Sequence, residues 1–421
     1  MTYNILDFGA KVCDALQTEK IQAAIDECFK AGGGEVIVPS GIYRTGGLRL
    51  RSNVALHMME GAILEGSDNP EDYLGFLEDK IEPIELYEQG DIPRSVYTYS
   101  RWMNALIRAI DAENISIIGE KNSYINGVNC FDAQGEEKYR GPHAINIYNC
   151  KNVTLKGYSI RNSANWAHAI FKSTDIVVEN ISVYGGHDGF DVFTCDNVIV
   201  KDCIFKTGDD CVAGFDNHNV LVKNCLFDST CSALRFGGTD VVIEDCKAVA
   251  PASFGFRGSL TQEQREKGAM TDENCRHNMV AVFTYYCDFR LEVRETPGNI
   301  VVKNCEFENA DILFRLQFDD KHVWCCNRSL DSIRFENCKA TGLYEATQIH
   351  GDINEPLAFE LENVELSARD ERKRDVIIDA TNYKKLSLKN VTLKNFENPE
   401  IIIHNKGEII IENTTDVKIR E

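Results

Sequence analysis

The sequence lacks long apolar runs and has comparatively little positive charge. No stretch approaches the ~18 consecutive apolar residues typical of a membrane-spanning helix, so we expect no membrane partner. Acidic residues outnumber basic ones 66 to 45, giving a formal net charge of −21. Because binding to phosphate backbones requires a basic patch, this balance argues against nucleic acid as a partner. The same charge would also keep a protein soluble.

Two further absences concern location and metal binding. The opening MTYNILDFGAKVCDALQTEK has no basic segment followed by an apolar one, which predicts a cytoplasmic protein. The 16 cysteines are sparse for a disulfide scaffold and many lie in apolar runs, so we expect buried free thiols. The pair Cys325–Cys326 fits no zinc spacing, so we expect neither a metal nor another cofactor.

The sequence does contain a repeat of about 22 residues. Its first five copies begin at residues 152, 175, 197, 219 and 240, and read NVTLKGYSI, DIVVENISV, NVIVKDCIF, NVLVKNCLF and DVVIEDCKA. Related phrases continue to residue 408. Each phrase has the alternating, β-branched character of one strand.

This period predicts an all-β protein with a single domain, residues 1–421, folded as a right-handed parallel β-helix. The period is too short for a propeller blade and lacks the leucine pattern of a leucine-rich repeat. Coils of such a solenoid stack at about 4.8 Å, so the repeated Asn and Cys residues should form buried ladders.

Two segments depart from the repeat. In the N-terminal cap region, residues 1–50, the apolar residues Ile21, Ala24, Ile25 and Cys28 have helical spacing and predict a helix that caps the open end. Between the copies at 240 and 299, the polar residues 257–298 predict a long, partly helical excursion.

The stretch FKTGDDCVAGFD places two acids, Asp209 and Asp210, between apolar runs. Residues 22 apart should lie above one another, so Asp188, Asp210 and Ser232 form one predicted row, with Trp166 below it. A neighbouring row contains His187, Asp209 and Cys231, and Arg257 follows within reach. We interpret Asp191 and Asp216 as structural groups at corners.

Carboxylates this close favour acid–base chemistry. At ~5 Å and an effective dielectric near 20, two of them repel by about 3 kcal/mol, which separates their pKa values by roughly two. One acid then holds its proton near neutral pH while another stays ionised, as general acid–base catalysis requires. A turn-capping role for Asp209 and Asp210 is the structural alternative.

Several segments resemble glycoside hydrolase family 28, the polygalacturonase family: YNILDFGAK near the start, AENISIIGEKNSYING, and RNSANWAHAIFKSTDIVVENISV. The likeness covers roughly residues 3–250. GHDGFD and TGDDC resemble two of the family's four motifs, N-T-D and G-D-D. The resemblance implies an inverting hydrolase of pectin-type chains that needs no metal. It puts Asp209 at the proton-donor position, with Asp188 and Asp210 activating the water.

The other two motifs, G-H-G and R-I-K, are altered. Ser232 stands where the family has the histidine, and FGFRGS keeps Arg257 but has Ser259 in place of the lysine. Because that lysine and arginine bind a sugar carboxylate in the family, the sugar is in question. Arg235 could supply the missing charge or be a solvated side chain, and His187 could replace the lost histidine. Trp166 is a candidate sugar platform or a core residue.

Three functions follow as hypotheses. The first is a cytoplasmic, inverting and exo-acting glycosidase for short pectin-derived oligosaccharides. The second is a neutral-sugar glycosidase or a transglycosylase on the same scaffold. The third is a non-catalytic β-helix that binds carbohydrate. The partner is an oligosaccharide in each case, and the sequence does not decide the oligomeric state.

Overall fold

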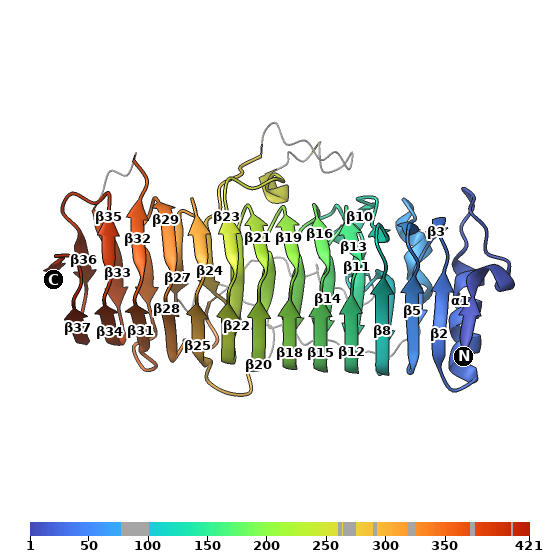
Figure 1. Cartoon of the computed structure of the whole chain (residues 1–421), viewed down its shortest axis with the longest axis horizontal. Helices are drawn as coiled ribbons and strands as arrows, with labels where there is room; N and C mark the ends of the chain where they lie inside the picture. The colour runs from blue at the N-terminus through green and yellow to red at the C-terminus, as the bar shows by residue number, and fades with distance from the viewer. Residues whose placement is uncertain are drawn as a thin grey trace.

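The protein is described by a computed structural model that covers residues 1–76, 101–259, 263, 275–288, 293–318, 325–370, 375–405 and 407–421. Its strands form two sheets in which every pairing between named strands is parallel. Successive coils stack along one axis, with the N-terminus at one end and the C-terminus at the other (Figure 1). The predicted all-β fold, a right-handed parallel β-helix, is confirmed.

Among the described residues, the larger sheet has 25 strands and joins two stacked columns of strands. The first column consists of β1 (Thr2–Asn4), β2 (Gly34–Val38), β5 (Val54–Met58), β8 (Glu113–Gly119), β12 (Lys151–Lys156), β15 (Thr174–Glu179), β18 (Asp196–Lys201), β20 (Val212–Lys223), β22 (Ser232–Glu244), β25 (Gly298–Lys303), β28 (Ser332–Glu336), β31 (Leu357–Glu362), β34 (Tyr383–Lys389) and β37 (Glu408–Glu412). The long strands β20 and β22 bend and also belong to the second column. Its other members are β4 (Leu48–Leu50), β7 (Ala105–Ile110), β11 (His143–Tyr148), β14 (His168–Phe171), β17 (Phe190–Phe193), β24 (Ala281–Tyr285), β27 (Ile312–Gln317), β30 (Thr347–His350), β33 (Val376–Thr381), β36 (Glu400–Ile403) and β38 (Lys418–Arg420).

In the part of the chain that the structure describes, the smaller sheet has 12 strands and closes the coils. Its members are β3 (Gly41–Thr45), β6 (Ala62–Gly66), β9 (Tyr124–Asn126), β13 (Ser159–Arg161), β16 (Ser182–Tyr184), β19 (Ile204–Thr207), β21 (Leu226–Ser229), β23 (Lys247–Val249), β26 (Glu306–Glu308), β29 (Lys339–Leu343), β32 (Glu365–Ala368) and β35 (Thr392–Lys394). A further strand, β10 (Phe131–Glu136), pairs antiparallel with Arg140 in a hairpin outside this stack.

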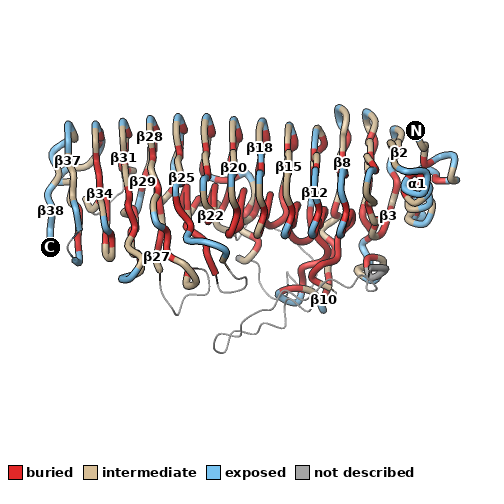
Figure 2. Tube along the Cα trace, turned by 90° about the horizontal axis from the view of Figure 1, so that it is seen from below, coloured by how far each residue is buried: buried red, intermediate tan, exposed pale blue. Residues whose placement is uncertain are grey.

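The core fills the inside of the coils, where alternate residues of each strand point inward. In β12, for example, Val153 and Leu155 are buried while Lys151 and Lys156 are exposed. The buried segments run along the interior of the stack and the exposed ones along its outer edges (Figure 2). Within the part of the chain that the structure describes, no helix is long and apolar enough to cross a bilayer.

The repeated cysteines form a buried column, as predicted. All 16 cysteines are free thiols. Cys203, Cys225 and Cys246 lie in successive coils, and the Cys225 backbone N–H donates to Cys246 Sγ at 3.4 Å. They contribute apolar volume rather than cross-links.

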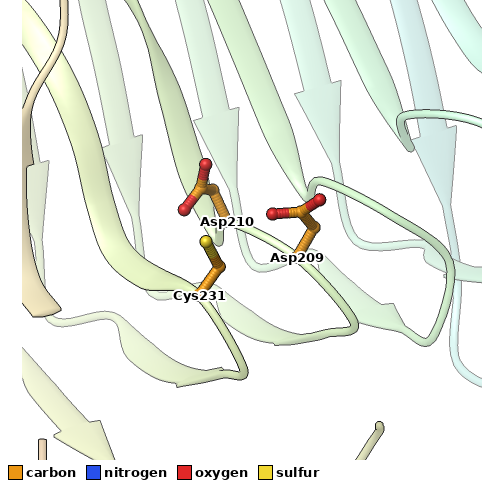
Figure 3. A group of neighbouring side chains, drawn as sticks. All are labelled: Asp209, Asp210 and Cys231. Atoms are coloured by element: carbon orange, nitrogen blue, oxygen red, sulfur yellow. The ribbon is translucent and has the colours of Figure 1, made fainter. Parts of the chain in front are cut away.

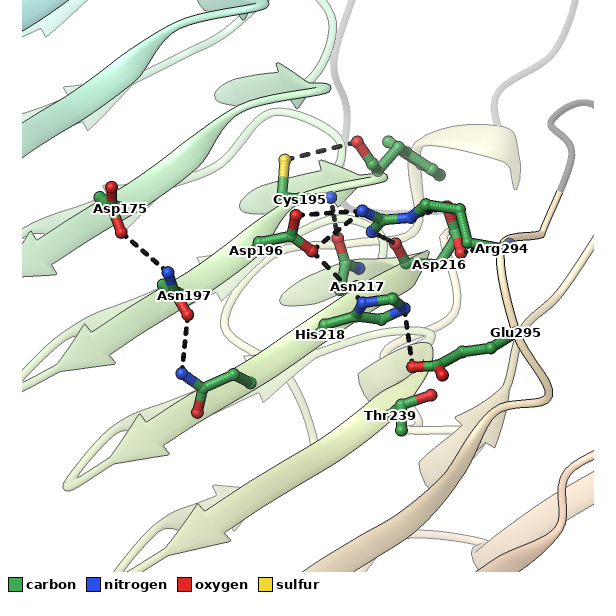
Figure 4. Close-up of polar contacts among 12 residues, drawn as sticks. Asp175, Cys195, Asp196, Asn197, Asp216, Asn217, His218, Thr239, Arg294 and Glu295 are labelled. Atoms are coloured by element: carbon green, nitrogen blue, oxygen red, sulfur yellow. Dashed lines mark hydrogen bonds and ion pairs between the residues drawn. The ribbon is translucent and has the colours of Figure 1, made fainter.

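The asparagine ladders differ from the prediction, because they lie on exposed corners and not in the core. Asn197 Nδ2 donates to Asp175 Oδ1, and Asn219 Nδ2 donates to Asn197 Oδ1, each at 2.8 Å (Figure 4). Asn197 and Asn219 have φ angles of 57° and 54°. Asparagine tolerates this left-handed backbone better than most residues. Both the backbone conformation at the corner and the ladder hydrogen bond therefore favour asparagine at these positions.

The N-terminal helix is α1 (Thr18–Lys30), and its buried residues Ile21, Ala24, Ile25 and Cys28 are those that the sequence predicted. It packs against β1, β2, β4 and β5 at the N-terminal end of the stack (Figure 1). Three short 3₁₀ helices, Ile5–Phe8, Pro70–Phe76 and Arg257–Ser259, and the helical residue Glu263 complete the described helical structure.

The bounds predicted for the excursion, 257–298, are corrected by the structure. Ala281–Tyr285 forms β24, which returns to the stack between β22 and β27. The repeats at 240 and 299 therefore belong to adjacent coils, since Val241 pairs with Ile300. Most of the predicted helical part, residues 260–262 and 264–274, lies outside the described residues.

Candidate active site

Three turns leading into the second column carry a row of linked polar groups. Asp188 and Asp210 lie before β17 and β20, Ser232 is the first residue of β22, and the predicted stacking of the three is present in the structure. Asp210 N–H donates to Asp188 Oδ1 at 3.0 Å, and Ser232 N–H donates to Asp210 Oδ1 at 2.8 Å. Each carboxylate thus accepts a backbone hydrogen bond from the next coil, which fixes its orientation.

Asp209 lies beside this row and points into the same space as Asp210 and Cys231 (Figure 3). One oxygen of each aspartate and the Cys231 sulfur lie within 4.8 Å of one another. These atoms could ligate a cation, but Asp210 already accepts the Ser232 N–H and pairs with Arg235 at 3.3 Å. The arrangement is therefore suited to proton transfer through its carboxyl groups.

Burial and mutual repulsion change the acidity of two of these groups. Desolvation, followed by the charge of Asp210, raises the pKa of Asp209 to about 6, against the opposing influence of Arg140 and Arg235. Desolvation also raises the pKa of Asp188 well above its usual range, and Asp191, Asp209 and Asp210 add to that effect. Near neutral pH, the site therefore holds exchangeable protons on carboxyl groups.

These groups open into a cavity of ≈ 340 Å³. Asp188, Asp209, Ser232, Arg235 and Trp166 all belong to its lining. Five of the eight residues singled out in the sequence, from four different coils, thus face one space. Such a concave site with a few convergent polar groups is the form that small-substrate sites commonly take.

Two of these five residues are held by aromatic contacts. The Arg235 guanidinium lies over the Tyr286 ring at 4.0 Å and donates to Asp210 Oδ2. Trp166 is buried, stacks on Phe193 at 5.8 Å and meets Trp102 edge-on at 5.3 Å. Trp166 is therefore part of the core, with one edge on the cavity.

Arg257, His187 and Asp210 are not among the residues that line the cavity. Arg257 is buried and donates to Asn129 Oδ1 at 3.1 Å and to the Ser163 carbonyl at 2.9 Å. Its guanidinium therefore ties separate coils together. His187 is fully buried and its ring lies 5.8 Å from the Tyr139 ring. Asp210 is fully buried directly behind the lining residues. Its carboxylate pairs with Arg235 at 3.3 Å and has an oxygen within 4.8 Å of a carboxylate oxygen of Asp209.

The sequence pattern did not predict the charged and polar groups at the two sides of the cavity. Glu136 and Arg140 come from the β10 hairpin, and Arg315 and Gln317 come from β27. Asp191, interpreted as a corner group, also lines the cavity and raises the pKa of Asp188. Of these, only Asp191 carried a signal, its proximity to Asp188 in GHDGFD.

Asp216 does occupy a corner, as predicted, with a φ angle of 57°. Its carboxylate accepts from the Arg294 backbone N–H and from Arg294 Nε, both at 2.9 Å (Figure 4). Arg294 also pairs with Asp196 at 3.0 Å. This network attaches the connection between β24 and β25 to the preceding coils.

The stacked coils and the carboxylates at the cavity define the chain as a parallel β-helix protein with an acidic site. The model for "Glycosyl hydrolases family 28" matches residues 89–232, which contain all three aspartates. This match supports the resemblance to the family that the motifs indicated.

Individual comparisons show partial sequence similarity to two curated proteins and a shared fold with a solved structure. The chain is 33% identical over 135 residues to the exo-poly-alpha-D-galacturonosidase of Dickeya chrysanthemi, covering 31% of this chain and 19% of that protein. It is 28% identical over 210 residues to the probable polygalacturonase of Vitis vinifera, covering 46% of this chain and 40% of that protein. The matches thus span less than half the length of either relative. A hyperthermoactive exopolygalacturonase from Thermotoga maritima superposes with a TM-score of 0.62 at 20% identity, covering 98% of this chain and 92% of that one.

Proposed function

We propose that the chain is an inverting, exo-acting glycoside hydrolase that cleaves short pectin-derived oligosaccharides of the galacturonate or rhamnogalacturonan type. The observation that carries this proposal is the group Asp188, Asp209 and Asp210, which successive coils bring together beside one cavity. The names of the Dickeya and Thermotoga relatives support exo action and a galacturonate substrate.

In the proposed mechanism, Asp209 is the general acid. With a pKa of about 6 it retains a proton in a useful fraction of molecules near neutral pH and donates it to the glycosidic oxygen as that bond breaks. Asp210 is the general base, because Arg235 and the Ser232 N–H stabilise its negative charge. It takes a proton from the water whose oxygen bonds to the anomeric carbon.

Asp188 orients that water. Its raised pKa favours the protonated form, so it can share hydrogen bonds with the water while Asp210 accepts the proton. The Arg235–Asp210 pair limits the distance over which Asp210 can move. One water is consumed, and the proton on Asp210 returns through solvent to Asp209.

The stereochemistry is decided by where the water fits. The closest atoms of Asp209 and Asp210 lie within 4.8 Å, whereas inverting enzymes separate their two carboxyl groups by ~6.5–9.5 Å. Inversion therefore requires the water to lie on the Asp188 side of Asp210. Proton NMR of the first-formed anomer on trigalacturonate tests this requirement. A retained anomer would overturn it and make Asp210 the nucleophile.

The role of Asp209 is tested by Asp209→Asn. We expect the variant to lose several orders of magnitude in kcat, because Asn cannot donate the carboxylic proton. Asp228→Asn is a matched control, since Asp228 is a buried aspartate on β21 that bonds to Ser253 and does not line the cavity. Unchanged turnover in Asp209→Asn would remove Asp209 as the acid.

A second candidate, a glycosidase for neutral sugars, is favoured by one observation. Arg257, the basic residue retained from the family's R-I-K motif, bonds to Asn129 and Ser163 outside the cavity lining. It is thus unavailable to a sugar carboxylate. Turnover of rhamnose-terminated oligomers in preference to galacturonate oligomers would favour this candidate.

A further inference from the structure

Of the described residues, three arginines line the cavity, and they differ in their partners. Arg140 pairs with Glu136 at 3.6 Å and with Glu137 at 3.5 Å. Arg235 pairs with Asp210 at 3.3 Å and lies over Tyr286. The charges of both are thus already matched by carboxylates of the protein.

Arg315 differs from both. Its Nη2 donates to Gln317 Oε1 at 2.9 Å, and among the described residues no carboxylate lies within ion-pair distance of its guanidinium. Arg315 is half-buried, so part of its hydration is already lost. A partly desolvated guanidinium that faces a cavity gains most from an anionic ligand, because carboxylates accept two parallel N–H bonds from it.

The register places Arg315 in line with the catalytic coils. In the second column, Ala213 pairs with Arg235, Arg235 with Thr284, and Thr284 with Arg315. At about 4.8 Å per coil, the backbones of Arg235 and Arg315 are roughly 10 Å apart. Thr284 lies between them, also on the cavity, with its hydroxyl 3.0 Å from Ser232 Oγ.

We infer that Arg315 and Gln317 form an anion-binding subsite, where a carboxylate of the oligosaccharide is bound away from the sugar that is cleaved. The Arg315 guanidinium contacts the carboxylate, and Gln317 orients the guanidinium. Thr284 offers a hydroxyl between this subsite and the acids. The inference rests on the proposed function for its site, and it selects uronic acids over neutral sugars as the substrate class.

The experiment compares trigalacturonate with its methyl ester, which has the same sugars without the charges. We expect Arg315→Gln to raise KM for trigalacturonate roughly ten- to hundredfold, the range of a lost charge-assisted bond, with a much smaller change in kcat. The preference for the free acid over the ester should disappear in this variant and be partly restored in Arg315→Lys. Arg420→Gln is the control, because Arg420 is an exposed arginine on the terminal strand.

Calorimetric binding of the same two probes separates this inference from the proposed function. Asp209→Asn and the double variant with Arg315→Gln are titrated without turnover. Loss of the free-acid preference on removing Arg315 supports the subsite even if no glycoside is hydrolysed. Equal binding of both probes by both proteins, or equal weakening for acid and ester, would overturn it. Matching thermal midpoints exclude a folding defect.

Discussion

At the scale of single residues, burial disfavours the ionised form of Asp209. The proposed role of Asp209 as a general acid depends on this raised pKa. A carboxyl whose folded-state pKa is raised destabilises the fold when it ionises. The pKa of Asp209 is about 6, against about 3.9 in an unfolded chain. Stability from this group therefore decreases as pH rises from about 4 to 6, and the loss is complete above that window.

Asp209→Asn should for this reason be more stable than the wild type at pH 7.5. We expect a gain of about 1–3 kcal/mol in the free energy of unfolding, which disappears near pH 4, where Asp209 is protonated in both states. Urea denaturation at the two pH values measures it. A variant that is less stable than the wild type at pH 7.5 would show that the ionised carboxylate is stabilised by its neighbours.

The stacking of this row of polar residues could be predicted from sequence because the repeat is regular there. Asp188, Asp210 and Ser232 are each 22 residues apart, and the coils between them contain no insertion. Arg315 could not be found in this way. Insertions lie between Arg235 and Thr284 and between Thr284 and Arg315, so these residues are not 22 apart in the sequence. Their strands nevertheless pair in register.

At the scale of elements, the asparagine corners combine a ladder hydrogen bond with a left-handed backbone. Asn219 has both, since its amide donates to Asn197 and its φ angle is 54°. The sequence predicted the ladder from the recurrence of Asn. It could not predict exposure, because both a core amide and a corner amide recur with the coil period.

Two substitutions of Asn219 separate the contributions. Asn219→Ala should cost about 2 kcal/mol in the free energy of unfolding, about 1 from the lost hydrogen bond and about 1 from forcing alanine into a left-handed conformation. Asn219→Gly loses the bond but accepts the backbone, so its cost should be smaller. Chemical denaturation of both variants measures the difference. Equal costs would mean that the backbone conformation contributes nothing.

At the scale of the whole molecule, the stack is a one-dimensional array in which each coil contacts its neighbours. The site lies in the middle coils, far from the terminal strands β36 and β38 (Figure 1). The overall repeat, the terminal helix and the position of the acids within it followed from local pattern. The charged sides of the cavity did not, because they come from a hairpin and from a coil beyond the insertion.

This architecture predicts that damage at one end need not reach the site. Phe227 on β21 stacks on Phe205 on β19 at 6.2 Å, on the strands that lead to Asp209 and Ser232, and Ile401 is fully buried in β36. Phe227→Ala should cost about 3–5 kcal/mol and lower the temperature at which activity is lost. Ile401→Ala should cost about 2–5 kcal/mol, yet mainly loosen the C-terminal coils.

The measurement is thermal inactivation compared with far-UV circular dichroism in the same samples. In Phe227→Ala both should shift together to lower temperature. In Ile401→Ala part of the dichroism should be lost at a temperature where activity persists, because the coils that hold Asp209 and Arg315 remain stacked. If the two signals instead coincide in Ile401→Ala, the stack unfolds as one cooperative unit and nearest-neighbour contacts do not limit the spread of damage.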